Sequence, residues 1–199
     1  MAFYENTIVA KQDLAEKELK SIKDKYTEVI NNSSGKVIKI EEWGLLNLAN
    51  KIKNYRKGFY IHYKFEGNTN TLNEVKKKIE VDGSIIRHLT VKYKKLDTEN
   101  EYFKKEKKKM KRKNKKFQKR GSNSLNKLSL FQKNDGKFSK KCPLSIKNAP
   151  VVDYKNINLL KKYMTDNGKI MSSQITSVSF RKQKKLTREI KKAKILGLI

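Results

Sequence analysis

The stretch 57–65 reads KGFYIHYKF and decides how the first part of the chain folds. Large apolar or aromatic side chains at every second position alternate there with Tyr60, His62 and Lys64. Because successive side chains of a β-strand point to opposite faces, this alternation predicts a strand with two different faces. One face packs into the core, and the other is available to a partner. The expected core residues are Phe59, Ile61, Tyr63 and Phe65.

Further strands and two helices surround this segment. Strand character is found at 3–10, 36–46 and 89–93. From Ala15 to Val29, apolar residues recur at helical offsets, and Asp13 ahead of them offers a cap oxygen. A second helical stripe runs from Leu72 to Ile79 and ends at Asp82-Gly83. The order strand, helix, strand, strand, helix, strand predicts an α+β, ferredoxin-like fold, with two helices on one face of a four-stranded antiparallel sheet.

Residues 2–94 resemble bacterial small-subunit ribosomal protein six. The resemblance is carried by Tyr4-Glu5, Gly35-Lys36-Val37, Trp43-Gly44-Leu45, Leu48-Ala49, Lys51-Ile52, Gly58-Phe59-Tyr60 and Arg87-His88-Leu89-Thr90. It implies a ferredoxin-like domain that binds ribosomal RNA. Near Leu46, where that family usually has a basic residue, this chain has none. The predicted RNA contacts of this domain are Lys51, Lys53, Arg56 and Lys57.

The same strand allows a second interpretation. The stretch 57–63 looks like the basic-Gly-aromatic core of an RNA-recognition motif, whose exposed aromatic rings stack on single-stranded bases. That motif has a small residue where Tyr60 stands, and its spacing differs by one residue. Base stacking by this strand is therefore the alternative to a core strand.

Charge indicates the kind of partner. The 199 residues include 49 Lys or Arg and 20 Asp or Glu, a net charge of +29. The net charge is +6 over residues 1–94, +13 over 95–141 and +10 over 142–199. Cations that neutralise phosphates release condensed counterions, so nucleic acid is the expected partner. An anionic membrane surface is the second candidate, and a Lys-rich surface that is merely solvated is the remaining alternative.

The middle block, 95–141, predicts a basic flexible connector. Nearly every residue between Glu106 and Arg120 is Lys or Arg, and repulsion among them opposes compaction. Such a segment is expected to fold on an RNA surface, and a disordered spacer is the alternative. A coil of this length spans roughly 5 to 6 Å times the square root of its residue number, which is ample reach between two small domains.

The last block, 142–199, predicts a small helical module. Asp153 precedes a helix that carries Ile157, Leu160 and Met164 and that Asn167-Gly168 ends. A second helix, 180–196, has an apolar stripe, and cations occupy the rest of its surface. Two helices give only a small core, so we expect the module to depend on a partner for stability.

This block resembles bacterial small-subunit ribosomal protein eighteen. The resemblance is carried by Cys142-Pro143, Asp153-Tyr154-Lys155, Leu159-Leu160, Gly168-Lys169-Ile170, Ile175-Thr176, Gln183, Leu186, Ile190-Lys191-Lys192-Ala193-Lys194 and Leu196-Gly197-Leu198. Where that family commonly has Pro-Arg-Arg, this chain has Ser172-Ser173-Gln174. The predicted RNA contacts of this block are Lys155, Lys169, Arg181, Lys182, Lys184, Lys185, Arg188, Lys191, Lys192 and Lys194.

Together the two resemblances imply a function. In these families, proteins six and eighteen associate on the platform of the small subunit, and this chain resembles both of them. We therefore expect a cytoplasmic, ribosomal protein in which residues 1–94 dock with 142–199 and bind small-subunit ribosomal RNA beside neighbouring ribosomal proteins. The alternative is a free RNA-binding or RNA-chaperone protein.

Catalytic and membrane signals are weak. His62 and His88 lie on predicted strands outside any recognisable catalytic motif, and we expect no enzyme activity, cofactor or metal. A phosphatase of ferredoxin-like fold is the remaining enzymatic alternative. Cys142 is the single cysteine, interpreted as a surface residue with a reactive thiol as the alternative. The apolar runs are far shorter than the ~20 residues that a membrane span needs, so a soluble chain is expected, with ribosomal RNA and not a membrane as its partner.

Overall fold

The computed structural model describes residues 2–97, 102–103, 142–146 and 149–199. It forms two compact units, residues 1–105 with 194–198 and residues 106–193 with 199. The predicted connector, 95–141, lies outside the described residues except for 95–97 and 102–103, so its behaviour stays a prediction.

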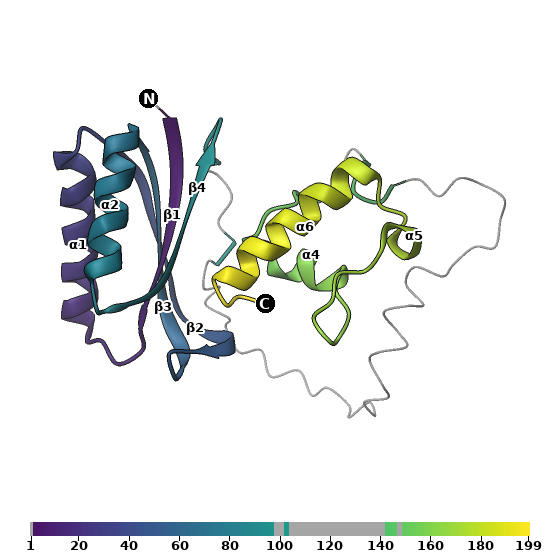
Figure 1. The fold of residues 1–199 in the computed structure, drawn as a ribbon, viewed down its shortest axis with the longest axis horizontal. Helices are drawn as coiled ribbons and strands as arrows, with labels where there is room; N and C mark the ends of the chain where they lie inside the picture. The colour runs from purple at the N-terminus through teal and green to yellow at the C-terminus, as the bar shows by residue number, and fades with distance from the viewer. Residues whose placement is uncertain (1, 98–101, 104–141, 147–148) are drawn as a thin grey trace, which may run out of the picture. The chain divides into compact units, whose positions relative to one another are not determined.

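The first unit is built on one antiparallel sheet. Its strands are β1 (Ala2–Lys11), β2 (Lys36–Ile52), β3 (Tyr55–Gly67) and β4 (Ile85–Tyr93), in the order β2-β3-β1-β4. Helices α1 (Glu16–Asn32) and α2 (Thr69–Val81) lie on one face of the sheet (Figure 1). This arrangement confirms the predicted ferredoxin-like fold.

The core of this unit lies between the sheet and the two helices. Ile61, Tyr63 and Phe65 of β3 are buried in it, as the alternation predicted, whereas Phe59 near the start of the strand is half-buried. Burying a side chain of this size stabilises the fold by about 1.5–3 kcal/mol. The remaining core residues are Tyr4, Ile8, Ile22, Tyr26, Val29, Ile30, Val75, Ile79 and Ile85.

The start of α1 differs from the prediction. Asp13 lies in a turn, and the residue that precedes the helix is Ala15. The carboxylate of Glu18 accepts a hydrogen bond from the Ala15 N–H at 2.8 Å. A carboxylate at the third helical position thus satisfies the N–H of the cap residue, and the predicted side-chain cap of the first-turn amides is absent at Ala15.

The β2–β3 hairpin extends beyond the predicted end of its first strand. Strand β2 continues to Ile52, and a two-residue turn of Lys53 (φ 47°) and Asn54 (φ 69°) joins it to β3. Two consecutive positive φ angles are typical of the turn that matches the twist of a hairpin. The hairpin end therefore holds a short basic segment away from the core.

The second unit is helical, with α4 (Ile157–Lys162), α5 (Ser173–Thr176) and most of α6 (Phe180–Ile195). The predicted helix through Met164 ends earlier, at Lys162. Met164 instead forms an isolated β-bridge with Ile170, across a turn in which Gly168 has a φ of +75°. Met164 is an apolar residue at a helical spacing from Leu160, which is why the sequence placed it in the helix. Its side chain is indeed buried, but the chain has left the helix before this residue. Helix α5 was not predicted.

Candidate nucleic-acid interface and docking face

Helix α6 separates apolar from cationic side chains. Leu186, Ile190 and Ala193 are fully buried, as the apolar stripe predicted. Cations at helical spacing lie on the exposed side, and the polar lysines between the two sides are half-buried. The exposed cations are Arg181, Lys184, Lys185, Arg188, Lys191 and Lys194, and the half-buried ones are Lys182 and Lys192. We call the six exposed cations the cationic stripe.

The hairpin end forms a second basic surface. Lys51 of β2, Lys53 of the turn and Arg56 and Lys57 of β3 are all exposed. Lys169, in the turn after α4, is also exposed. These predicted contacts are therefore accessible to a phosphate, and their role stays a prediction.

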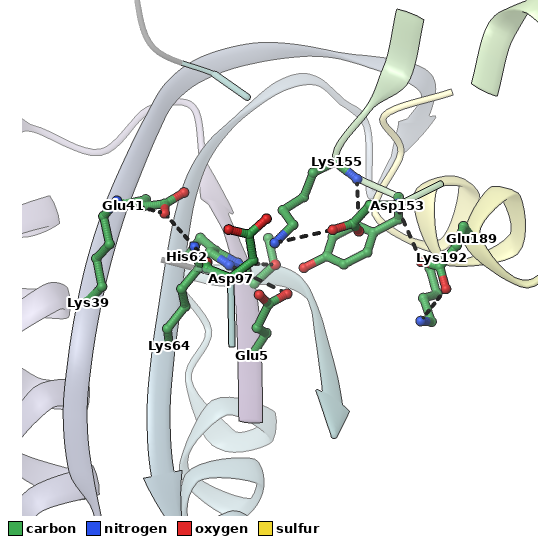
Figure 2. A network of polar contacts seen from close by, with 12 residues as sticks. Glu5, Lys39, Glu41, His62, Lys64, Asp97, Asp153, Lys155, Glu189 and Lys192 are labelled. Carbon is green, nitrogen blue, oxygen red and sulfur yellow. Dashed lines mark hydrogen bonds and ion pairs between the residues drawn. The ribbon is translucent and has the colours of Figure 1, made fainter. Parts of the chain in front are cut away.

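Lys155 differs from the other predicted contacts. Its side chain is buried, and its Nζ lies 3.4 Å from a carboxylate oxygen of Asp153. A buried lysine that is held by a carboxylate is less accessible than the other predicted contacts, and the role of Lys155 as an RNA contact stays a prediction. Nearby, Glu189 accepts hydrogen bonds from the Tyr154 N–H at 3.2 Å and from Lys192 at 2.8 Å (Figure 2).

The sheet face opposite the helices is covered. Tyr60, His62 and Lys64 of β3 are each at most 1% exposed. Trp43 stacks on His62 with ring centroids 4.9 Å apart, and Phe103 stacks on Trp43 at 4.2 Å. A buried Tyr60 ring offers no surface to a base, so the interpretation of this strand as an RNA-recognition motif is wrong.

A buried ion pair lies on the same face. Lys64 Nζ is 2.7 Å from Glu41 Oε1, and Lys64 also donates to the carbonyl of Asp97 (Figure 2). Lys39 lies 3.4 Å from the same carboxylate oxygen. Burial raises the pKa of Glu41, but the hydrogen bond and charge of Lys64 outweigh it and lower the pKa below its ordinary value. The carboxylate is therefore ionised, and the pair is a structural element of the first unit.

The end of the chain lies on this face, in the same unit. Residues 194–198, which we call the C-terminal segment, present three consecutive carbonyls to the sheet. The Tyr60 hydroxyl donates to the Leu196 carbonyl at 2.6 Å, and the Ala49 N–H donates to that of Gly197 at 2.8 Å. Arg87 Nη1 donates to the carbonyl of Ile195 at 3.3 Å. Sequence reasoning missed these contacts, since no local pattern links residues so far apart.

Cys142 is partly exposed, and the Ser179 N–H lies 3.3 Å from its sulfur. Burial raises the pKa of this thiol, but hydrogen bonds from Ser145 and Ser179 lower it to about 7. Within the part of the chain that the structure describes, no group of three or more His, Cys, Asp or Glu could hold a metal ion. No described helix has the length and apolar character needed to cross a bilayer.

Comparison with known proteins assigns both parts of the chain to one class, the ribosomal proteins of the small subunit. The family Ribosomal protein S6 matches residues 3–92, and the family Ribosomal protein S18 matches residues 148–199. The chain belongs to the ribosomal protein S6 family through its first part and to the ribosomal protein S18 family through its last part.

Two relatives, one for each part of the chain, agree with this assignment. Small ribosomal subunit protein bS6 of Pelagibacter ubique is 40% identical over 106 residues, which cover 53% of this chain and 88% of the relative. Protein bS18 of the same organism is 62% identical over 72 residues, covering 36% of this chain and 78% of the relative. The crystal structure of 30S ribosomal protein S6 from Thermotoga maritima is 25% identical and has a TM-score of 0.45, covering 46% of this chain and 87% of that one.

Proposed function

We propose that this chain is a structural component of the small ribosomal subunit in the cytoplasm, where it binds ribosomal RNA of the platform region with both of its halves. The observation that carries the proposal is the cationic stripe of α6 in a chain whose two parts belong to two small-subunit protein families. Neighbouring ribosomal proteins are further expected partners. We propose no enzymatic role.

Binding to RNA is electrostatic in this proposal. The cationic stripe and the hairpin end place their charges along phosphates and so position the chain, while little base-edge specificity is expected. Each neutralised phosphate releases counterions, and the affinity falls as salt rises. If about ten phosphates are contacted, the logarithm of the affinity falls with the logarithm of salt concentration with a slope of about −9.

Both halves act as one body in this proposal, with residues 1–94 docked to 142–199 within the chain. The three hydrogen bonds of the C-terminal segment to Ala49, Tyr60 and Arg87 support it. A covalent connection makes such docking intramolecular, which raises the effective concentration of one half for the other to the millimolar range for a short flexible connection.

A salt titration of filter binding to platform RNA tests the RNA interface. Replacing Lys184, Lys185 and Arg188 with Gln is expected to lower the slope by about 1 for each side chain. The matched control replaces three exposed lysines of α2, residues 76–78, with Gln. It removes the same charge outside the proposed interface and is expected to leave the slope unchanged. Equal losses in both triple variants contradict the proposed interface.

Mass spectrometry of purified small subunits tests the assignment to the ribosome. We expect one species near 23.3 kDa whose peptides map to both family segments. A chain found only in ribosome-free gradient fractions contradicts the proposal and supports a free RNA-binding or chaperone protein instead.

A further inference from the structure

The C-terminal segment includes the end of α6, where every α-helix leaves backbone carbonyls without a partner in the helix. The last four carbonyls of a helix have no partner within the helix, and the helix dipole makes this end partly negative. The carbonyl of Ile195, the last residue of α6, and the carbonyls of the next two residues accept from three donors of the first unit. These donors are the side chains of Arg87 and Tyr60 and the backbone N–H of Ala49. Arg87 therefore supplies a partner for the last carbonyl of α6, and its charge has the sign that this end attracts.

Gly197 gives the segment a backbone conformation that lets it pack closely against β2. Its φ is +69°, a conformation that other residues rarely adopt, and its N–H donates to the Lys194 carbonyl at 3.0 Å, as is common just after a helix end. A Cβ at this position would lie 3.0 Å from Leu48 Cδ2 and 3.2 Å from Ile52 Cδ1. A side chain at this position would thus require both the rare positive φ and a shift of the Leu48 and Ile52 side chains by a few tenths of an ångström.

Apolar burial completes the contact. Leu196 is 0% exposed and Leu198 is 6% exposed, on either side of Gly197. We call the surface that receives the segment, formed by Leu48, Ala49, Ile52, Tyr60 and Arg87, the docking face. Each of its three donors is used by a carbonyl of the C-terminal segment. A second copy of the segment would find the same donors and the same space already taken.

We propose that the chain fills its own docking face, so that it excludes a separate protein that ends in the same kind of segment. The partner class excluded is an S18-type chain with a basic helix that ends in the Leu-Gly-Leu pattern. Tethering at millimolar effective concentration favours the attached segment over a free one at micromolar concentration. One fused chain then replaces two proteins in each small subunit. The biological setting of this inference rests on the proposed function, but its test requires neither RNA nor ribosomes.

The test adds a synthetic peptide of residues 180–199 to the full-length chain. Trp43 is the only tryptophan of the chain and stacks on Tyr60 at 6.1 Å, while the peptide contains neither Trp nor Tyr. Tryptophan emission therefore comes from the chain and not from the peptide, and Trp43 senses the docking face through its contact with Tyr60. For a segment with an intrinsic Kd of about 100 μM, a millimolar effective concentration raises the apparent Kd about tenfold in the wild-type chain.

Gly197→Val opens the docking face in the chain without altering the face itself. We expect this variant to bind the wild-type peptide about tenfold more tightly than the wild-type chain does. Gly168→Val is the matched control, because Gly168 also has a positive φ (+75°) but nothing lies within 4 Å of an added Cβ. It should bind the peptide as weakly as the wild-type chain. A peptide that carries the Gly197→Val change should bind to none of the three chains.

A chain that stops after Ile195 provides a second opening of the face without a strained residue, and should bind the peptide as the Gly197→Val variant does. Equal peptide affinity for the wild-type and opened chains overturns the proposal, and so does failure of both opened chains to bind. The proposed function fails separately, by absence of the chain from purified small subunits. If the chain is found in small subunits but the wild-type chain binds the peptide as tightly as the opened chains do, only this inference is refuted.

Discussion

The buried pair of Lys64 and Glu41 predicts an asymmetric response to mutation. Removing one partner of a buried ion pair costs about 3–5 kcal/mol, because the other charge stays buried without compensation. Lys64→Met leaves Glu41 with Lys39 at 3.4 Å and with the Trp43 indole N–H at 3.3 Å, so we expect the low end, about 3 kcal/mol. Glu41→Leu leaves the ammonium of Lys64, at 0% exposure, with the Asp97 carbonyl but without its carboxylate partner, so we expect about 5 kcal/mol.

Urea unfolding followed by Trp43 emission measures these changes. With a slope of about 1.5 kcal/mol/M, Lys64→Met is expected to lower the midpoint by about 2 M. The double variant Glu41→Leu, Lys64→Met removes both charges and should regain the wild-type free energy of unfolding to within about 1 kcal/mol. Lys23→Met is the matched control: its pair with Glu42 has a similar 2.8 Å distance but is exposed, so the expected cost is below about 1 kcal/mol. A double variant less stable than both single variants refutes the reasoning.

Three further predictions concern other sites. Burial raises the pKa of Asp82, but hydrogen bonds, that of Lys25 foremost, lower this pKa below its unfolded value. The stabilising effect of the Asp82 carboxylate is therefore complete above the unfolded pKa and is lost as pH falls through the folded pKa. Asp82→Asn should make the urea midpoint depend less on pH between pH 6 and pH 3. Cys142, with a pKa of about 7, should react with iodoacetamide along a pH profile whose midpoint lies near 7, whereas a midpoint near 8.5 after unfolding is the expected reference. Tyr60→Phe leaves the buried Leu196 carbonyl without its donor and should cost about 1–3 kcal/mol in urea unfolding.

The fold of the first unit could be predicted because its local signals agree with its packing. The alternation in β3 placed Ile61, Tyr63 and Phe65 in the core, and the helical stripes placed α1 and α2 on it. The exact ends were less predictable. Strand β2 continues to a hairpin turn of two ordinary polar residues, Lys53 and Asn54. Helix α1 begins without the expected side-chain cap, and the carboxylate at its third position accepts from the N–H of the cap residue.

The candidate RNA interface could be predicted from charge wherever a cation lies on a periodic helix. The cationic stripe of α6 follows directly from the spacing of its apolar residues. Lys155 could not be placed in this way, because it lies just before a short helix where no periodicity indicates which side chains are buried. Its neighbour Asp153 holds it, and only the three-dimensional arrangement reveals that contact.

The covered face of β3 shows why an alternating pattern identifies two faces without telling which of them meets solvent. Tyr60, His62 and Lys64 have the polarity of an exposed surface, yet they are buried under side chains and backbone from distant parts of the chain. Polar atoms on a buried face need hydrogen-bond partners, so they favour a covering segment that supplies such partners. A covering segment that brings no acceptor leaves the Tyr60 hydroxyl unpaired, at a cost of about 1–3 kcal/mol, and a bulky residue in place of Gly197 meets the side chain of Leu48. The docking face thus discriminates against other segments, because a wrong segment leaves hydrogen bonds unmade or overlaps with side chains. A uniformly apolar face imposes no hydrogen-bond penalty of this kind. The polar residues of the docking face therefore indicate a specific occupant.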